Sequence, residues 1–283
     1  MKKIRKLYGV MLFLLIASAK LYAQTSDSGL PKETKPQFKI SINYNTHLNY
    51  YGRTDSLQSS GVFPLAEVWF TPDFYVNAAP IFVNNSLKSF DYAGTVATAG
   101  YQFNSNNKWL GNFYVLKPFY KESSELVQSV LKAQGSASLT LLNNYLNVTA
   151  GGDVKFSDKP DFGATAGLDH IFRVPLSNEM ILVFDPSAYL YAGTQQFSKS
   201  YYKKSNFLFL SGNEQQVTEF SSKFNILAYE FSVPVIFSNG KFQLLATPAY
   251  IVPQNLITVP GRPDLSERGK EMFYATIAMK VSF

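Results

Sequence analysis

The sequence lacks cysteine altogether, and its only histidines among 283 residues are His47 and His170. Without cysteine there are no disulfides, no thiolate metal sites and no cysteine nucleophile. No GxSxG, HExxH, P-loop or glycine-rich dinucleotide turn is present either. The sequence therefore predicts no catalytic residue, no cofactor and no metal site.

A hydrophobic run of roughly 20 residues, the length that a membrane-spanning helix needs, is also missing. The main apolar run, from Tyr8 to Ala19, is shorter. A basic stretch precedes it at 2–6, and Leu21-Tyr22-Ala23 follows it. This order is typical of a secretory signal peptide. We expect residues 1–23 to be a signal peptide cleaved near Ala23, residues 24–36 to be a flexible lead-in, and residues 37–283 to form one domain.

Charged residues are scarce at 16%, against about 25% in typical soluble domains. The net charge of +6 arises mostly in the signal segment, which contributes five of the 26 basic residues and none of the 20 acidic ones. The remaining chain is close to neutral, so it has no basic field that would attract phosphates. We therefore expect no nucleic-acid partner.

Aromatic residues are abundant at 16%, yet the mean hydropathy is only −0.06, because apolar side chains are interspersed with polar ones. The alternation is clearest from Phe273 to Phe283, where every second residue is apolar. Successive side chains of a strand point to opposite faces. The pattern predicts an all-β protein whose strands have one apolar and one polar face.

Turn signals divide the domain into about twelve strands. We expect them at 37–51, 61–71, 74–84, 90–104, 108–120, 125–142, 145–157, 161–174, 179–193, 222–237, 241–252 and 271–283. Every second connection is tight, whereas the others include the long segments 194–221 and 253–270. Strands of about 10 residues with aromatic ends, such as Tyr50 and Tyr51 in the first, suit a bilayer and its two interfaces. The predicted fold is a closed antiparallel transmembrane β-barrel.

The signal segment, the repeated hairpins and the terminal strand from Phe273 to Phe283 resemble the outer-membrane β-barrels of Gram-negative bacteria. The Ala23-Gln24 junction resembles signal junctions common in the Bacteroidetes. The resemblance implies a bacterial outer-membrane location, with outer-membrane lipid around the barrel. It also implies that the closing strand, ending in Phe283, is the signal that the barrel-assembly machinery recognises.

The polar face of the strands carries charges of both signs, which we expect to point into the lumen. The predicted lumen-lining residues are Lys39, Glu67, Lys132, Asp153, Lys155, Asp169, Arg173, Asp185, Glu230 and Lys280. Such charges either pair across the lumen and plug it or line a narrow water path. We predict a passive pore for small solutes, with a plugged structural or surface-interaction barrel as the alternative.

His47 raises a third possibility, an outer-membrane lipid hydrolase. Outer-membrane phospholipases are similar twelve-stranded barrels that place a histidine and a serine near the outer leaflet, and Ser59 or Ser60 lies close in sequence. His47, however, follows the lumen-facing parity, whereas these enzymes place the site on the lipid-facing side. His170 lies near the opposite end of its strand, so it does not complete such a site. We therefore expect a barrel that is not an enzyme.

In the connection at 194–221, Tyr201, Tyr202, Lys203 and Lys204 precede an apolar stretch at 207–210. We expect it to extend the flanking strands into a hairpin above the membrane. The alternative is a loop that folds inward and constricts the pore.

Overall fold

The computed structural model of the protein describes residues 36–122, 124, 126, 130–196, 223–258 and 266–283. None of these residues belongs to a helix with the length and hydropathy needed to cross a membrane. The expected signal peptide at 1–23, nearly all of the lead-in and most of the 194–221 connection lie outside the described residues. Those expectations therefore remain predictions.

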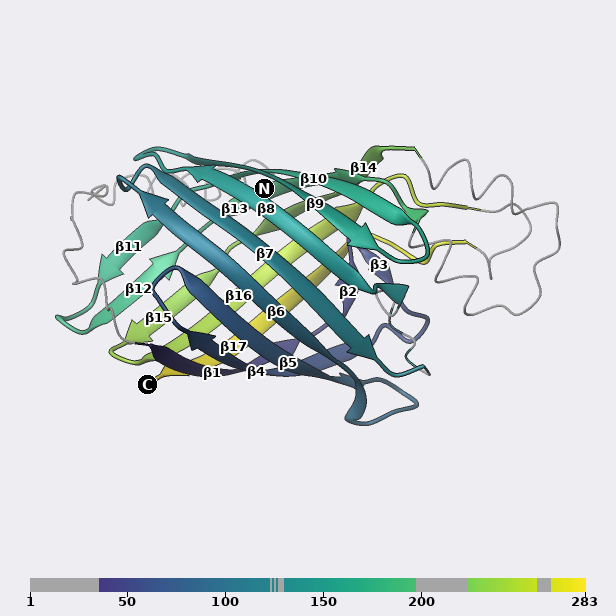
Figure 1. Ribbon diagram of the computed structural model, residues 1–283, viewed down its shortest axis with the longest axis horizontal. Coiled ribbons are helices and arrows are strands. Elements are labelled where there is room, and N and C mark those ends of the chain that lie inside the picture. The colour runs from purple at the N-terminus through teal and green to yellow at the C-terminus, as the bar shows by residue number, and fades with distance from the viewer. Residues whose placement is uncertain (1–35, 123, 125, 127–129, 197–222, 259–265) are drawn as a thin grey trace, which may run out of the picture. The chain divides into compact units, whose positions relative to one another are not determined.

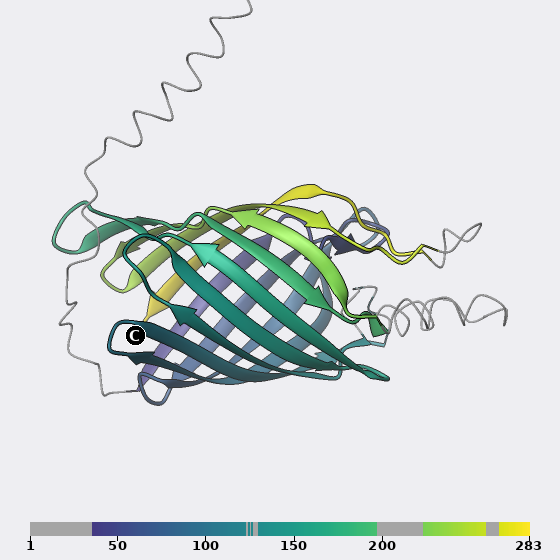
Figure 2. The same ribbon diagram turned by 90° about the horizontal axis from the view of Figure 1, so that it is seen from above.

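The predicted barrel is confirmed: twelve antiparallel strands form one closed sheet (Figures 1 and 2). In chain order they are β1 (Gln37–Asn45), β4 (Ser60–Trp69), β5 (Phe74–Asn84), β6 (Asp91–Ser105), β7 (Trp109–Tyr120), β8 (Ala133–Leu141), β9 (Asn147–Phe156), β10 (Pro160–Asp169) continued by β11 (Phe172–Pro175), β12 (Met180–Phe184) continued by β13 (Ser187–Gly193), β14 (Asn225–Ser232) continued by β15 (Val235–Asn239), β16 (Phe242–Pro253) and β17 (Met272–Ser282). Pro186 and Pro234 lie at two of the interruptions, where proline has no N–H to give to the ladder.

The sheet closes between the first and last strands. β1 pairs with β17 in antiparallel register, from Lys39 opposite Ser282 to Asn45 opposite Thr276. The N–H of Phe283 then donates to the carbonyl of Phe38 at 2.8 Å, and the two rings lie 6.0 Å apart. Closure pairs the edges that an open sheet would leave unsatisfied in lipid.

The two faces of the wall differ as the alternation predicts. On β1 and β17 the outward Ile42 and Met279 are 57% and 54% exposed, whereas the inward Ser41 and Ala278 are 4% and 6% exposed. The exposed large hydrophobic side chains recur around the strands. This apolar outer wall is that of a barrel that spans the outer membrane.

The connections sort by length between the two ends of the barrel. The C-terminus lies at the same end as the tight turns between β4 and β5, between β11 and β12, and between β15 and β16 (Figure 1). We call this the tight-turn end and the other the long-loop end. In outer-membrane barrels short turns face the periplasm and long loops face outside. One long-loop connection is itself short, because only 157–159 joins β9 to β10.

Two strand boundaries differ from the prediction. The first strand was expected to run to Tyr51 but ends at Asn45, and the strand expected to begin at 125 begins at Ala133. Tyr51 and Gly52 have φ of 53° and 75°, so the chain reverses there and forms the hairpin of β2 (Asn49–Tyr50) and β3 (Arg53–Thr54). Local alternation continued through this reversal, and it therefore did not reveal where the strand stops.

The assignment of faces predicts that an arginine destabilises the barrel more on the lipid face of the wall than on the lumen face. We expect Ile42→Arg to destabilise the barrel by about 2–4 kcal/mol, the cost of a cation near the bilayer midplane on the lipid face. Gln243→Arg is the matched control, because Gln243 is exposed, lies on the inward face and pairs with Lys280. Guanidinium titration of barrels refolded in lipid vesicles measures both values. Equal destabilisation by the two variants would contradict the assignment.

Candidate functional site

Four of the ten predicted lumen residues form two ion pairs on the polar face of the wall. Lys280 Nζ lies 2.7 Å from Glu67 Oε1 across β17, β1 and β4. Lys155 forms an ion pair with Asp153 on β9. Lys39 Nζ lies 4.3 Å from the centre of the Trp69 ring, an arrangement that favours a cation.

Other predicted residues accept hydrogen bonds on the inward wall. Glu230 accepts from the Tyr274 hydroxyl at 2.9 Å, and Asp169 accepts from the Asn147 amide at 2.7 Å. Asp185 lies where β12 gives way to β13, and one of its carboxylate oxygens is buried with no hydrogen bond from the residues that the structure describes. That these residues line a path for solutes stays a prediction.

Two predicted residues lie at the ends of the barrel. Arg173 is exposed on β11, toward the tight-turn end. Lys132 precedes β8 at the long-loop end, where its 65% exposed side chain lies 3.2 Å from Asp158. An exposed pair of this kind contributes little to stability, because water screens both charges.

Residues 46–59, which we call the inner segment, fold against the inward wall at the long-loop end (Figure 1). Within it Arg53, Asp55 and Ser59 are 2%, 4% and 2% exposed. The segment joins two neighbouring strands, β1 and β4, yet it reaches residues of β14 on a distant part of the wall. The outer end of the lumen is therefore narrowed by a segment of which residues 46–51 were predicted to continue the first strand.

Arg53 is the anchor of the inner segment. Its guanidinium donates to the carbonyls of Leu227 at 3.2 Å and Gln254 at 3.1 Å, and to Gln195 Oε1 at 2.9 Å. Its Nε lies 3.1 Å from Glu267 Oε2. Arginine suits this position, because its planar fork presents five donors in fixed directions.

Backbone contacts reinforce the anchor. Arg53 forms an antiparallel bridge with Gly269, and the N–H of Thr54 donates to the carbonyl of Arg268 at 2.8 Å. The inner segment is thus joined to the chain that leads into β17, in addition to the contacts that Arg53 makes beside β13, β14 and β16.

A group of tyrosines packs beside Arg53. The rings of Tyr50 and Tyr51 lie 4.6 Å apart, Tyr51 lies 5.0 Å from Tyr191, and Tyr191 stacks at 6.2 Å on Tyr189. Burial raises the pKa of both Tyr50 and Tyr51 above the ordinary value, so both phenols stay neutral. We expected Tyr50 and Tyr51 at the membrane interface. They instead line the lumen because the chain turns inward after Asn45.

The other side of the inner segment is apolar. A cluster of Ile81, Val83, Ala93 and Leu126 is packed against Leu48, Phe63, Val96 and Tyr120. Leu48 belongs to the inner segment and Leu126 to the connection between β7 and β8, whereas the others come from the wall. The segment is therefore held by hydrophobic contacts on one side and by Arg53 on the other.

A cavity of about 150 Å³ remains between the inner segment and the wall. Its lining residues are Asn45, Leu48, Asn49, Tyr50, Arg53, Asp55, Phe63, Ile81 and Leu126. A water molecule occupies about 30 Å³ in the liquid, so the cavity has room for several. Polar side chains face it, which makes it a site for water or a small polar solute.

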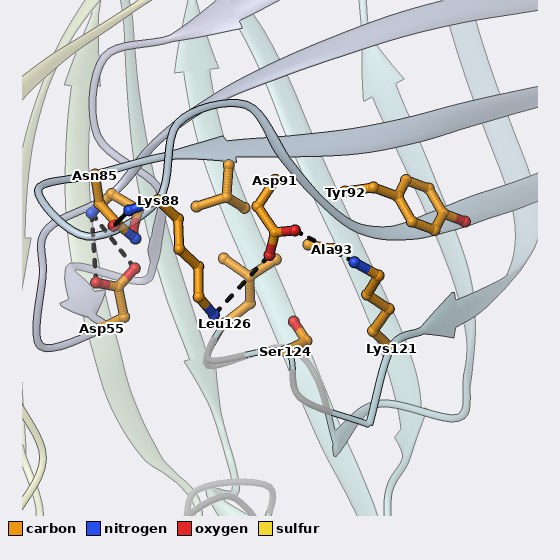
Figure 3. A pocket seen from close by; sticks show the side chains of 11 residues that line it. Asp55, Asn85, Lys88, Asp91, Tyr92, Ala93, Lys121, Ser124 and Leu126 are labelled. Carbon is orange, nitrogen blue, oxygen red and sulfur yellow. Dashed lines mark hydrogen bonds and ion pairs between the residues drawn. The ribbon is translucent and has the colours of Figure 1, made fainter.

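A second, smaller pocket lies at the rim of the long-loop end (Figure 3). Asp91 receives two ammonium groups there, Lys121 at 3.2 Å and Lys88 at 3.9 Å. Its volume of about 20 Å³ holds about one water molecule. The pocket is too small for a substrate. Its main feature is that the ammonium groups of Lys88 and Lys121 both contact the carboxylate of Asp91.

The residues of the hydrolase hypothesis are not assembled into a triad. His47 Nδ1 lies 3.3 Å from Thr46 Oγ1, Ser59 accepts from the Asn85 amide, and Ser60 donates to the carbonyl of Asn84. No hydrogen bond joins His47 to either serine in the described part of the chain. The described part of the chain also contains no group of three or more His, Asp or Glu side chains that could hold a metal ion.

No protein-family model matches the sequence, and no curated protein resembles it at the sequence level. Among solved structures the chain is similar to the KdgM porin, with a TM-score of 0.48, 9% identity, and coverage of 87% of this chain and 99% of that one. It is also similar to the NanC porin, with a TM-score of 0.42, 9% identity and coverage of 86% and 98%. LpxR from Salmonella typhimurium matches with a TM-score of 0.42, 8% identity and coverage of 86% and 99%. At these values no function is carried over from those proteins to this chain.

Proposed function

We propose that the protein is a passive outer-membrane pore for small solutes, narrowed at its outer end by the inner segment, and that it is not an enzyme. The observation that carries this proposal is the exposure of inward charges at the tight-turn end. Lys280 points inward, yet its side chain is 30% exposed. Water therefore reaches the lumen from that end.

The inner segment decides whether the path continues outward. Beside it lies the cavity of about 150 Å³ with Asn45, Asn49 and Asp55 in its lining. Charges of both signs line the wall below, so size selects solutes more strongly than the sign of their charge. Small polar solutes fit a path of this kind, whereas large ones are excluded.

Buried ion pairs favour the alternative, a plugged barrel. Arg53 and Glu267 have side chains only 2% exposed, and Lys155 and Asp153 are only slightly more exposed. Pairs of this kind are held tightly once formed, because separating them leaves an uncompensated buried charge. Conductance distinguishes the two functions.

A reversible cross-link tests whether solutes pass the inner segment. Thr54 and Arg268 are hydrogen-bonded across an antiparallel bridge, where opposite Cα atoms lie about 4.5–5.5 Å apart, as a disulfide needs. The chain has no cysteine of its own, so Thr54→Cys/Arg268→Cys forms a single defined bond. In planar bilayers we expect ion conductance to fall when the pair is oxidised and to return with a reductant.

The outcomes of the cross-link separate the possibilities. Absence of conductance steps in the wild type, with a folded barrel confirmed by its shifted gel mobility, would sink the pore and favour the plug. Equal conductance of the oxidised and reduced forms would show that solutes bypass the inner segment. Thr54→Cys alone, treated in the same way, is the control.

Loss of the anchor should widen the path. We expect Arg53→Met, which keeps the bulk and removes the charge and all donors, to release the inner segment and raise conductance severalfold with longer openings. Removing one partner of a buried ion pair typically costs about 3–5 kcal/mol, and here the loss falls on the segment. Lys132→Met, which breaks an exposed pair at the same end, is the matched control and should leave conductance unchanged. An unaltered Arg53→Met channel would contradict the anchoring role.

A further inference from the structure

Among the described strands, the outer wall of the barrel carries one charged residue, Lys117. Lys117 lies on β7 between Val115 and Phe119, which are 48% and 55% exposed, and its partner on β6 is Ala97. Asp91, the first residue of β6, pairs with the buried Val83 at the rim. The other charged residues of the described barrel strands follow the inward parity. They are Lys39, Glu67, Asp153, Lys155, Asp161, Asp169, Arg173, Glu230 and Lys280. A lysine facing lipid is costly unless its ammonium reaches a polar layer.

The side chain of Lys117 points toward the long-loop rim. Its Nζ lies 5.4 Å from the centre of the Phe119 ring, two residues nearer the end of β7. The strand ends at Tyr120, about 10 Å along the chain from Lys117. Lysine side chains at this depth extend to the headgroup layer. Among the described residues Lys117 has no carboxylate within ion-pair distance.

Further polar groups lie above Lys117 on the same wall. The hydroxyls of Tyr92 and Thr95 are 2.8 Å apart, and both are near the start of β6. Lys121 Nζ lies 5.7 Å from the centre of the Tyr92 ring and reaches Asp91, the carboxylate that Lys88 also contacts (Figure 3). Two lysines therefore share one carboxylate near this rim, Lys117 adds a third ammonium group lower on the wall, and the hydroxyl groups of Tyr92 and Thr95 lie beside Lys121. A phosphate monoester or diester complements such a set.

An apolar hollow of about 370 Å³ lies lower on the same wall. Its outward-facing lining comes from β6 to β9 and comprises Tyr101, Phe103, Phe113, Ala137, Leu139 and Ala150. Phe113 is four residues from Lys117 on β7, a distance of about 13 Å along the strand. A fatty acyl chain below a headgroup at Lys117 reaches that depth, since it crosses half of a hydrocarbon core about 30 Å thick.

We propose that the β6–β9 face of the barrel binds a phosphorylated glycolipid of the outer leaflet. Lys117 and Lys121 contact a phosphate group, the Tyr92 and Thr95 hydroxyls lie beside it, and an acyl chain occupies the hollow. The long-loop end faces outward in such barrels, and outer-leaflet phosphates are carried chiefly by glycolipids. The proposal depends on the outer-membrane location and not on whether the lumen conducts.

Native mass spectrometry of the detergent-solubilised barrel tests the site. The probes are bis-phosphorylated lipid A, the same lipid after removal of its phosphates, and phosphatidylglycerol. We expect lipid A to be retained by the wild type and by Lys117→Arg, and to be retained severalfold less by Lys117→Gln. Lys117→Gln removes a charge from the lipid face, so it should fold at least as well as the wild type. Lys132→Gln, which removes the charge of an exposed lysine elsewhere at the long-loop end, is the matched control and should retain lipid A normally.

Each other outcome overturns a defined part of the proposal. Equal retention of the dephosphorylated lipid would show that no phosphate is recognised. Retention of phosphatidylglycerol as strong as that of lipid A would assign the site to anionic phospholipids. Lipid A retention by Lys117→Gln equal to that of the wild type would remove Lys117 from the site.

Discussion

The pairing of every backbone polar group within the sheet is the constraint on which the rest of the structure depends. In hydrocarbon an unpaired N–H or carbonyl costs several kcal/mol, so the sheet has to close, and β1 and β17 provide the closing pair. Closure then turns one face of every strand toward the lipid and the other toward the lumen. The alternation of side chains follows directly, because each residue is assigned to one of two solvents.

Within that wall the inner segment occupies part of the interior at the long-loop end, and Arg53 fixes it in one position. A guanidinium with partners beside β13, β14 and β16 allows few alternative placements, because each displaced donor would remain buried and unpaired. The hydrophobic contacts of Leu48 on the opposite side are less directional. The directional contacts therefore set the position, and the apolar contacts add to its stability.

The sequence predicted the part of the fold that depends on period and on turns. Strand number, closure and the inward or outward direction of residues such as Ile42 and Lys280 all follow from alternation within about ten residues. The inner segment could not be predicted this way, because its partners lie far away in the chain: Arg53 contacts residues 195, 227, 254 and 267. Tyr50 and Tyr51 are aromatic residues at the predicted end of a strand, where an interfacial girdle is expected. They point inward because the chain turns into the lumen after Asn45 and reverses at Tyr51 and Gly52, and the local alternation marks neither change of direction.

Lys117 differs from the lumen charges in the partners that are available to it. An inward charge can be satisfied by another side chain, as Lys280 is by Glu67, and its position therefore says little about external ligands. An outward charge has only lipid and its own neighbours, and Phe119 is the neighbour that Lys117 contacts. A cation–π contact at an exposed site is worth only about 0.5–1 kcal/mol, too little to offset a lysine placed deep in hydrocarbon. The depth of Lys117, close enough to the rim for its ammonium to reach the headgroups, is therefore what makes the residue compatible with the wall.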